Sequence, residues 1–266
     1  MKNIFYILNS IISNRKLILD LSFKDLKKRF AGSTLGFAWA ILKPLLTAIV
    51  YLLVFQFAFK SSDVNDVPFS IWFIVGIIPW LFISEVIDSA SNCFLEYSFL
   101  VKKVIFNYDI LPLVKILSSL FIHVVFICIA LIACGFMNLG INLHFLMILY
   151  YLFCAVCFSF SVSLLFSTIL VFFRDLSQII NLILLVGMWA APIAWNLEQF
   201  SKQIQILLML NPVVYIINGY RVAYFGSSQL FQGLYYTLYF WIAVSILLLV
   251  GSFLYKKLKG SFADVL

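Results

Sequence analysis

Long apolar runs separated by short polar segments extend over almost the whole chain. Each run has the roughly 20 residues that a helix needs to cross about 30 Å of hydrocarbon, and a helix satisfies its own backbone hydrogen bonds there. The pattern therefore predicts an all-α integral membrane protein with six transmembrane helices. These lie at about residues 35–59, 69–92, 110–136, 143–173, 176–196 and 234–255.

An amphipathic helix is predicted just before the first apolar run. Leu19, Phe23, Leu26 and Phe30 recur at spacings of four, three and four, which puts them on one helical face. The three lysines of residues 24–28 fall outside that face. We expect this helix to lie in the cytosolic membrane interface, with its basic residues near anionic headgroups.

A shorter apolar stretch, IQILLMLNPVVYII at residues 204–217, lies between the fifth and sixth runs and contains Asn211 and Pro212. Its length favours a re-entrant or interfacial segment on the outer side over a full span. The chain is then one transmembrane domain, residues 1–266, in four parts. They are a cytosolic N-terminal segment with the interfacial helix (1–34), the first five spans (35–196), an outer-side segment (197–233), and the last span with a cytosolic tail (234–266).

Composition and charge support a membrane protein and predict its orientation. Charged residues make up only 11% of the chain, against about a quarter in soluble domains. With the N-terminus in the cytosol, fourteen of the 18 Lys and Arg residues fall in cytosolic segments, three fall on the other side, and Lys43 lies inside the first span. Cytosolic segments of membrane proteins are enriched in Lys and Arg, so both termini are predicted to be cytosolic. The net charge of +7 is spread over short segments and forms no nucleic-acid-binding face.

The cytosolic segment at residues 93–112 holds more apolar residues than a solvated loop needs. We expect a short helix that docks on a soluble partner, and a helix lying on the membrane is the alternative. The residues concerned are Leu100, Val101, Lys102, Lys103, Val104, Ile105 and Phe106.

Four ionisable residues, Lys43, Glu85, Asp88 and Lys115, lie in the cytosolic halves of predicted spans, where an unpaired charge is costly. Glu85 and Asp88 are three residues apart and share a helical face. We predict that Lys43 or Lys115 pairs with Glu85 or Asp88, either as structural contacts within the bundle or as contacts to a substrate.

Motifs for catalysis are missing from the sequence. It contains no GxxxxGK[ST] loop for nucleotide phosphates, no HExxH and no GxSxG. His123 lies inside a span, where we expect it to be packed or hydrogen-bonded, and Cys154 and Cys157 are expected to be apolar packing residues. We therefore expect a protein that is not an enzyme and that itself binds no cofactor or metal.

Aromatic residues make up 18% of the chain. Most aromatic side chains in membrane proteins serve as packing or as interfacial belts. An aromatic-lined conduit would also suit a long neutral polymer, because sugar rings stack their C–H faces on aromatic planes.

Several stretches together resemble the permease subunit of type-2 ABC exporters, in the branch that exports O-antigen, capsule or teichoic-acid polysaccharides. The resemblance rests on LKKRFAGSTLGFAWAILKPLL, GIIPWLFISEVIDSASNCFLE, VKKVIFNYDILPL, VFFRDLSQIINLILLVGMWAAPIAW and LNPVVYIINGYR, in this order. It implies a bacterial inner-membrane protein in which two copies of the chain assemble with two copies of a separate ATP-binding subunit. That subunit would bind ATP and Mg²⁺, and the cargo would be a lipid-linked polysaccharide.

The resemblance also implies roles for particular residues. Residues 100–106 would be the coupling helix that contacts the ATP-binding subunit, and Lys27, Lys28 and Arg29 would lie near the pyrophosphate of the lipid carrier. Residues 198–230, with Asn211, Pro212 and Arg221, would form an outer gate. The first and fifth spans would line the conduit with Trp39, Tyr51, Phe55, Trp189 and Trp195. An ABC permease for another cargo, a lipid or a drug, and a membrane enzyme acting on lipid-linked sugars are the alternatives.

Overall fold

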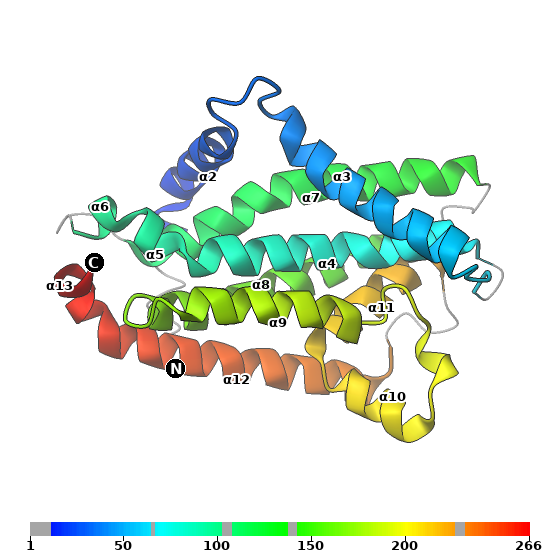
Figure 1. Cartoon of the computed structure of the whole chain (residues 1–266). Coiled ribbons are helices and arrows are strands. Elements are labelled where there is room, and N and C mark those ends of the chain that lie inside the picture. The colour runs from blue at the N-terminus through cyan, green and yellow to red at the C-terminus, as the bar shows by residue number, and fades with distance from the viewer. Residues whose placement is uncertain (1–11, 65–66, 103–107, 138–142, 227–231) are drawn as a thin grey trace.

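A computed structural model describes residues 12–64, 67–102, 108–137, 143–226 and 232–266. Its named elements in these ranges are all helical (Figure 1). Five helical segments are long and apolar enough to cross a membrane: Ala38–Ala58, Phe69–Ser91, Tyr108–Phe136, His144–Leu170 and Leu234–Val265. The predicted all-α membrane fold is confirmed.

The individual helices follow the predicted apolar runs closely. The long ones are α3 (Ala38–Leu53, continued by the π-helical turn Val54–Ala58), α4 (Phe69–Ser91), α7 (Leu111–Phe136), α8 (Met147–Leu170) and α12 (Leu234–Leu258). The shorter ones are α2 (Arg15–Arg29), α5 (Cys93–Glu96), α6 (Ser98–Val101), α9 (Leu176–Ala190), α10 (Lys202–Met209), α11 (Pro212–Phe225) and α13 (Phe262–Val265).

Helix α4 forms the centre of the bundle and packs against α7, α8 and α11. In its most apolar stretch 72% of the residues are buried, against 6% in α3. A helix that is apolar all round is expected in such a central position. Helices α3 and α9 lie on the outside, and each has a single buried residue, Ala40 in α3 and Ile180 in α9.

Helix α9 is shorter than the predicted fifth span, because it ends at Ala190 rather than near residue 196. Ala191 adopts an extended backbone, φ −90° and ψ 143°, and it precedes Pro192. A residue before proline is disfavoured in the α conformation, which explains the early end. The 15 residues of α9 rise about 22 Å, less than the hydrocarbon thickness.

The stretch predicted to be re-entrant forms two helices, α10 and α11, that meet at an angle of 100°. Asn211 caps α11, since its Oδ1 accepts a hydrogen bond from the Val213 backbone N–H at 3.0 Å, and Pro212 is the first residue of that helix. Proline suits the first turn of a helix but ends the one before it. The bend fits a re-entrant segment, and a broken span would have the same geometry.

The short helices gather near the two ends of the bundle (Figure 1). Helices α2, α5, α6 and α13 lie at one end, which we call the α2 end, and α10 lies near the other, which we call the α10 end. Helix α2 exists as predicted, but only part of the apolar stripe packs on the bundle: Leu26 is buried, whereas Leu19 and Phe23 are exposed. The buried side also includes Ile18, Ser22 and Asp25.

Candidate functional site

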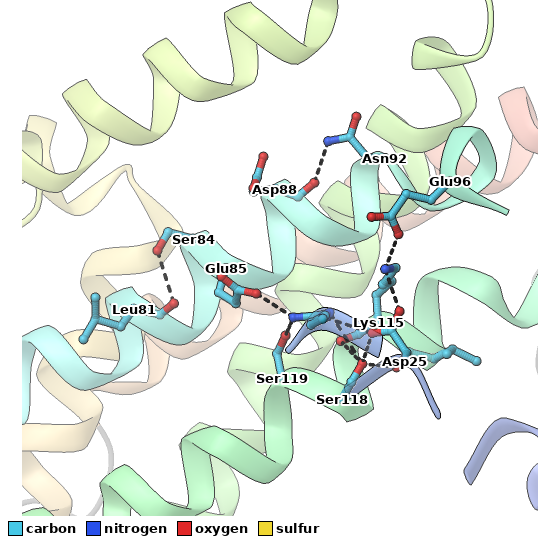
Figure 2. A network of polar contacts seen from close by, with 12 residues as sticks. Asp25, Leu81, Ser84, Glu85, Asp88, Asn92, Glu96, Lys115, Ser118 and Ser119 are labelled. Atoms are coloured by element: carbon cyan, nitrogen blue, oxygen red, sulfur yellow. Dashed lines mark hydrogen bonds and ion pairs between the residues drawn. The ribbon is translucent and has the colours of Figure 1, made fainter. Parts of the chain in front are cut away.

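A buried carboxylate joins three helices at the α2 end. Asp25 of α2 is 2% exposed. Lys115 Nζ and Ser118 Oγ of α7 each donate to its carboxylate at 2.7 Å. Tyr97 Oη, from the junction of α5 and α6, also donates at 2.7 Å. Figure 2 shows how Asp25, Lys115 and Ser118 converge.

Arg29 extends the same network, which we call the Asp25 network, to α4. Its Nε lies 2.9 Å from an oxygen of Asp25 and its Nη1 lies 2.6 Å from Glu85 Oε1. Nη1 also donates to Ser119 at 3.2 Å. Lys115 forms a second ion pair, with Glu96 of α5. Five charged groups from α2, α4, α5 and α7 are therefore linked.

The predicted pairing of Lys43 or Lys115 with Glu85 or Asp88 is wrong for Lys115, whose partners are Asp25 and Glu96. Within the described ranges Lys43 has no ion pair of 4.0 Å or less and interacts with Asp88 only at longer range. The reason is that α2 lies against α7 and supplies its own charges to α4 and α7.

The electrostatics of the Asp25 network keep Asp25 ionised. Burial alone would raise the pKa of its carboxyl, but Arg29, Lys115 and the hydrogen bonds from Lys115 and Ser118 lower it to about 2. Burial, followed by the hydrogen bond to Asp25, raises the pKa of the Tyr97 hydroxyl, so that group stays protonated and remains a donor. Asp25 and Tyr97 therefore each keep one protonation state at neutral pH.

A cavity of about 330 Å³, which we call the inner cavity, lies beside the network between α2, α3, α4 and α7. Its wall combines the charged side chains of Arg29, Lys43 and Glu85 with the aromatic rings of Phe30 and Trp39. Such a lining can contact a molecule that has both polar and apolar parts. In the residues that the structure describes, no three His, Cys, Asp or Glu side chains are placed to hold a metal ion.

His123, which also lines the inner cavity, is packed and hydrogen-bonded as expected. Its Nε2 lies 2.7 Å from Tyr220 Oη of α11, and its ring stacks on Phe82 with the centroids 4.5 Å apart. The contact ties α7 to α11 through the core.

Four of the five predicted conduit residues lie together between α3 and the end of α9. The Trp189 ring lies 6.3 Å from Tyr51 and 6.2 Å from Phe55, between centroids. Trp195 Nε1 donates to the Trp189 carbonyl at 3.1 Å. We call Tyr51, Phe55, Trp189 and Trp195 the aromatic seam. Trp39 does not join them and lines the inner cavity instead.

A second cavity, of about 320 Å³ and called here the outer cavity, lies at the α10 end of the seam. Phe55 and Trp195 belong to both the aromatic seam and the wall of the outer cavity. Trp72, Lys60 and Asn196 form much of the rest of that wall. The rings and the amide and ammonium groups together offer stacking faces and hydrogen-bond donors.

Arg221, predicted to belong to an outer gate, is buried behind this cavity. Its guanidinium carbon lies 3.4 Å from the centroid of the Trp72 ring, and its Nη2 donates to the Ile193 carbonyl at 3.1 Å. Gly76 leaves the necessary space, because a Cβ there would lie 2.6 Å from Nη2. Arg221 thus links α11 to α4 and to the segment after α9.

The predicted partner-docking segment is only partly described. Lys103, Val104, Ile105 and Phe106 lie outside the described residues. Lys102 is exposed and Leu100 is partly buried. Val101, which we expected to face a partner, is buried instead, because Phe94, Tyr97 and Val101 form one inward stripe. Phe99 was missed: it is exposed beside Lys102.

Among the residues predicted to bind a lipid head, Lys27 and Lys28 are exposed. The guanidinium of Arg29 is instead bound to Asp25, Glu85 and Ser119. Sequence reasoning missed that role, together with Asp25, Tyr97 and Ser118. A usable signal was present: Ile18, Ser22, Asp25 and Arg29 recur at spacings of four, three and four, which marks a second, polar face of α2.

Comparison with known proteins finds that residues 17–225 match the model of the ABC-2 type transporter family. The chain is 26% identical over 254 residues to O-antigen export system permease protein RfbA of Klebsiella pneumoniae, covering 94% of this chain and 95% of that one. It is 25% identical over 230 residues to capsule polysaccharide export inner-membrane protein CtrC of Neisseria meningitidis serogroup A, covering 83% of each. It is 24% identical over 218 residues to polysialic acid transport protein KpsM of Escherichia coli, covering 76% and 79%.

Proposed function

The chain belongs to the ABC-2 type transporter family, and from this premise we propose that it is the membrane subunit of an exporter of a lipid-linked polysaccharide. The observation that carries the proposal is the likeness, over three quarters of the chain or more, to permeases named for O-antigen, capsule and polysialic acid. Transport runs from the cytosol across the inner membrane, with both termini of the chain in the cytosol.

The working assembly has two copies of this chain and two copies of a separate ATP-binding subunit. The uncovered apolar faces of α3 and α9 support a second copy of the chain as their partner. ATP and Mg²⁺ bind to the other subunit, which meets this chain at the α2 end through Phe99, Lys102 and the residues that follow. Closure of the ATP-binding subunits shifts the chain between conduit-closed and conduit-open states.

The aromatic seam supplies the conduit wall. Tyr51, Phe55 and Trp189 offer ring faces from two different helices, and ring faces hold a sugar without a fixed charge that would trap it. A neutral polymer can therefore slide along them. The outer cavity takes the polymer next, and the bent pair α10–α11, hinged at Asn211 and Pro212, acts as its outer gate.

The inner cavity and the exposed lysines of α2 receive the lipid-linked end. Lys27 and Lys28 lie on the exposed side of α2, where basic residues attract anionic lipid heads. Lys43 adds a positive charge to the wall of the inner cavity. Arg29 takes part only indirectly, because it holds Glu85 in place.

A strain that lacks only this chain tests the proposal. We expect polymer to disappear from the cell surface while full-length lipid-linked polymer accumulates inside, with both restored by the wild-type gene. Loss of polymer from both places would favour an enzyme that acts on lipid-linked sugars. Unchanged surface polymer would refute the polysaccharide cargo and leave an exporter of a lipid or drug.

A neutralised variant tests the lysines separately. Lys27→Gln with Lys28→Gln should lower export and leave assembly with the ATP-binding subunit intact. Lys16→Gln with Lys24→Gln, on the same helix, is the matched control. Equal export in both double variants would refute the proposed lipid-head contact.

A further inference from the structure

Residues 259–266 pack into the α2 end through one aromatic side chain. The turn Lys259–Ser261 leads into α13 (Phe262–Val265), and Phe262 is fully buried although Asp264 and Val265 beside it are exposed. Segments this short are ordered only where tertiary contacts hold them. Phe262 is therefore the fully buried anchor of this segment, with Leu266 partly buried against the same cluster.

Phe262 contacts four rings from four different parts of the chain. The centroid distances are 5.2 Å to Phe94 of α5, 6.2 Å to Tyr108 before α7, 5.9 Å to Phe172 between α8 and α9, and 6.0 Å to Tyr255 of α12. Aromatic pairs at such distances contribute beyond simple burial. One side chain thus contacts two connections at the α2 end, α4–α7 and α8–α9, and also helix α12.

Polar contacts reinforce this aromatic cluster. The Tyr108 hydroxyl donates to the Lys259 carbonyl at 3.1 Å, and the Tyr255 hydroxyl donates to the buried carboxylate of Asp109. Lys259 Nζ lies 3.8 Å from the same carboxylate. The turn before Phe262 is thereby tied to the start of α7 as well.

The cluster faces the same short helices that we assign to the ATP-binding subunit. Phe94, Tyr97 and Val101 point inward, toward the cluster that contains Phe262, and α13 lies against α6 (Figure 1). The opposite side of α5 and α6 leaves Phe99 and Lys102 exposed. The packing of Phe262 therefore decides which side of this segment is available to a partner.

We propose that Phe262 is a positioning residue for energy coupling. It holds α5 and α6 so that Phe99 and Lys102 face the ATP-binding subunit, and it transmits movement of that segment to α12 and to the α8–α9 turn. This inference rests on the proposed function, because it requires an ATP-driven partner.

The test compares Phe262→Ala with Phe253→Ala, which removes an exposed phenylalanine from α12. Each is produced as the full chain together with the ATP-binding subunit, and export is divided by the amount of assembled complex in the membrane. We expect Phe262→Ala to lower export per complex about tenfold and Phe253→Ala to leave it within about twofold. Phe262→Leu, which keeps apolar volume, should fall between them. If the alanine variant fails to accumulate, export per complex of Phe262→Leu is the measurement that tests the proposal.

A second readout separates coupling from simple stability. Phe99→Cys should form a crosslink to the ATP-binding subunit whose yield rises on ATP addition, and Phe262→Ala should abolish that rise. Normal export per complex together with a normal crosslink response would overturn the inference. The crosslink response does not depend on the cargo. It therefore still tests Phe262 if the deletion strain refutes a polysaccharide cargo. A normal response in Phe262→Ala would refute only the role of Phe262 and leave the proposed function standing.

Discussion

Two arginines, the partly buried Arg29 and the buried Arg221, lie toward opposite ends of the molecule and are held in different ways. Arg29 at the α2 end is bound by carboxylates of α2 and α4. Arg221, toward the α10 end, lies on the face of Trp72 and donates to a carbonyl, and in the described part of the chain no carboxylate lies within 4.0 Å of it. The guanidinium can use either environment, because it is planar and weakly hydrated.

The difference indicates what each end can do. A network of paired charges loses stability when its central buried member is removed, since the cations around it keep only their half-exposed partners, Glu85 and Glu96. The contact of an arginine with an aromatic ring depends on how closely the two side chains fit, so changes in packing weaken it. Substitutions that change charge should therefore destabilise the α2 end most, and substitutions that change side-chain volume should destabilise the α10 end most.

The largest effect is expected for Asp25→Asn, which leaves Arg29 and Lys115 without their shared carboxylate. We expect the free energy of unfolding to fall by about 3–5 kcal/mol, measured by denaturation of the purified chain in detergent. Asp20→Asn, on the exposed side of the same helix, should change it by less than about 0.5 kcal/mol. Equal effects of the two substitutions would contradict the conclusion that ion pairs stabilise the α2 end.

Acid should reveal the same network. The pKa of Asp25 is lowered from 3.8 to about 2 in the folded chain, so its contribution is complete above about pH 4 and is lost as the pH falls through 2. The contribution is about 2 kcal/mol. The melting temperatures of the wild type and Asp25→Asn should differ by a constant amount between pH 5 and 8, and the gap should narrow below about pH 4. A gap that changed across the neutral range would point to another titrating group.

A volume change should affect the α10 end more than a matched change elsewhere. Gly76→Ala places a Cβ 2.6 Å from Arg221 Nη2, which forces the guanidinium off Trp72 at a cost of about 1.5 kcal/mol. Gly135→Ala, where nothing lies within 4 Å of the new Cβ, should be neutral or slightly stabilising because alanine favours helix. Tryptophan fluorescence should shift for Gly76→Ala alone.

The smallest effect is expected for Arg221→Lys, which keeps the charge and loses the planar stacking on Trp72. A loss of about 1 kcal/mol is expected. It should not grow when salt is raised, whereas the partly exposed Arg29–Glu85 pair should weaken. A salt-sensitive Arg221→Lys would show that charge, rather than ring contact, holds this end.

Much of the helical framework follows from the sequence. Apolar length alone predicts α4, α7, α8 and α12 to within a few residues, and the Asn–Pro pair at 211–212 predicts the break between α10 and α11. The end of α9 required a local cause, Pro192, that a count of apolar residues does not include.

The candidate site is harder to predict from the sequence, because its contacts join residues far apart in the chain. Periodicity predicts α2 but not which side of it meets the bundle, since lipid and protein can both cover apolar residues. The partner of Lys115 was therefore sought within the spans, whereas it is Asp25 on α2. The burial of Val101 was missed for the same reason. Val101 packs in a cluster with Phe262, which lies more than 150 positions further along the chain.

The Asp25 network also has a consequence for biosynthesis. The partners of α2 lie 56 residues away at Glu85 and 90 residues away at Lys115, so both are translated after α2 has left the ribosome. At about 5–20 residues per second, Asp25 waits for some seconds before Lys115 appears. During that interval the only one of these ion-pair partners available to Asp25 is Arg29, on the same helix, and the arrival of α7 adds Lys115 and Ser118.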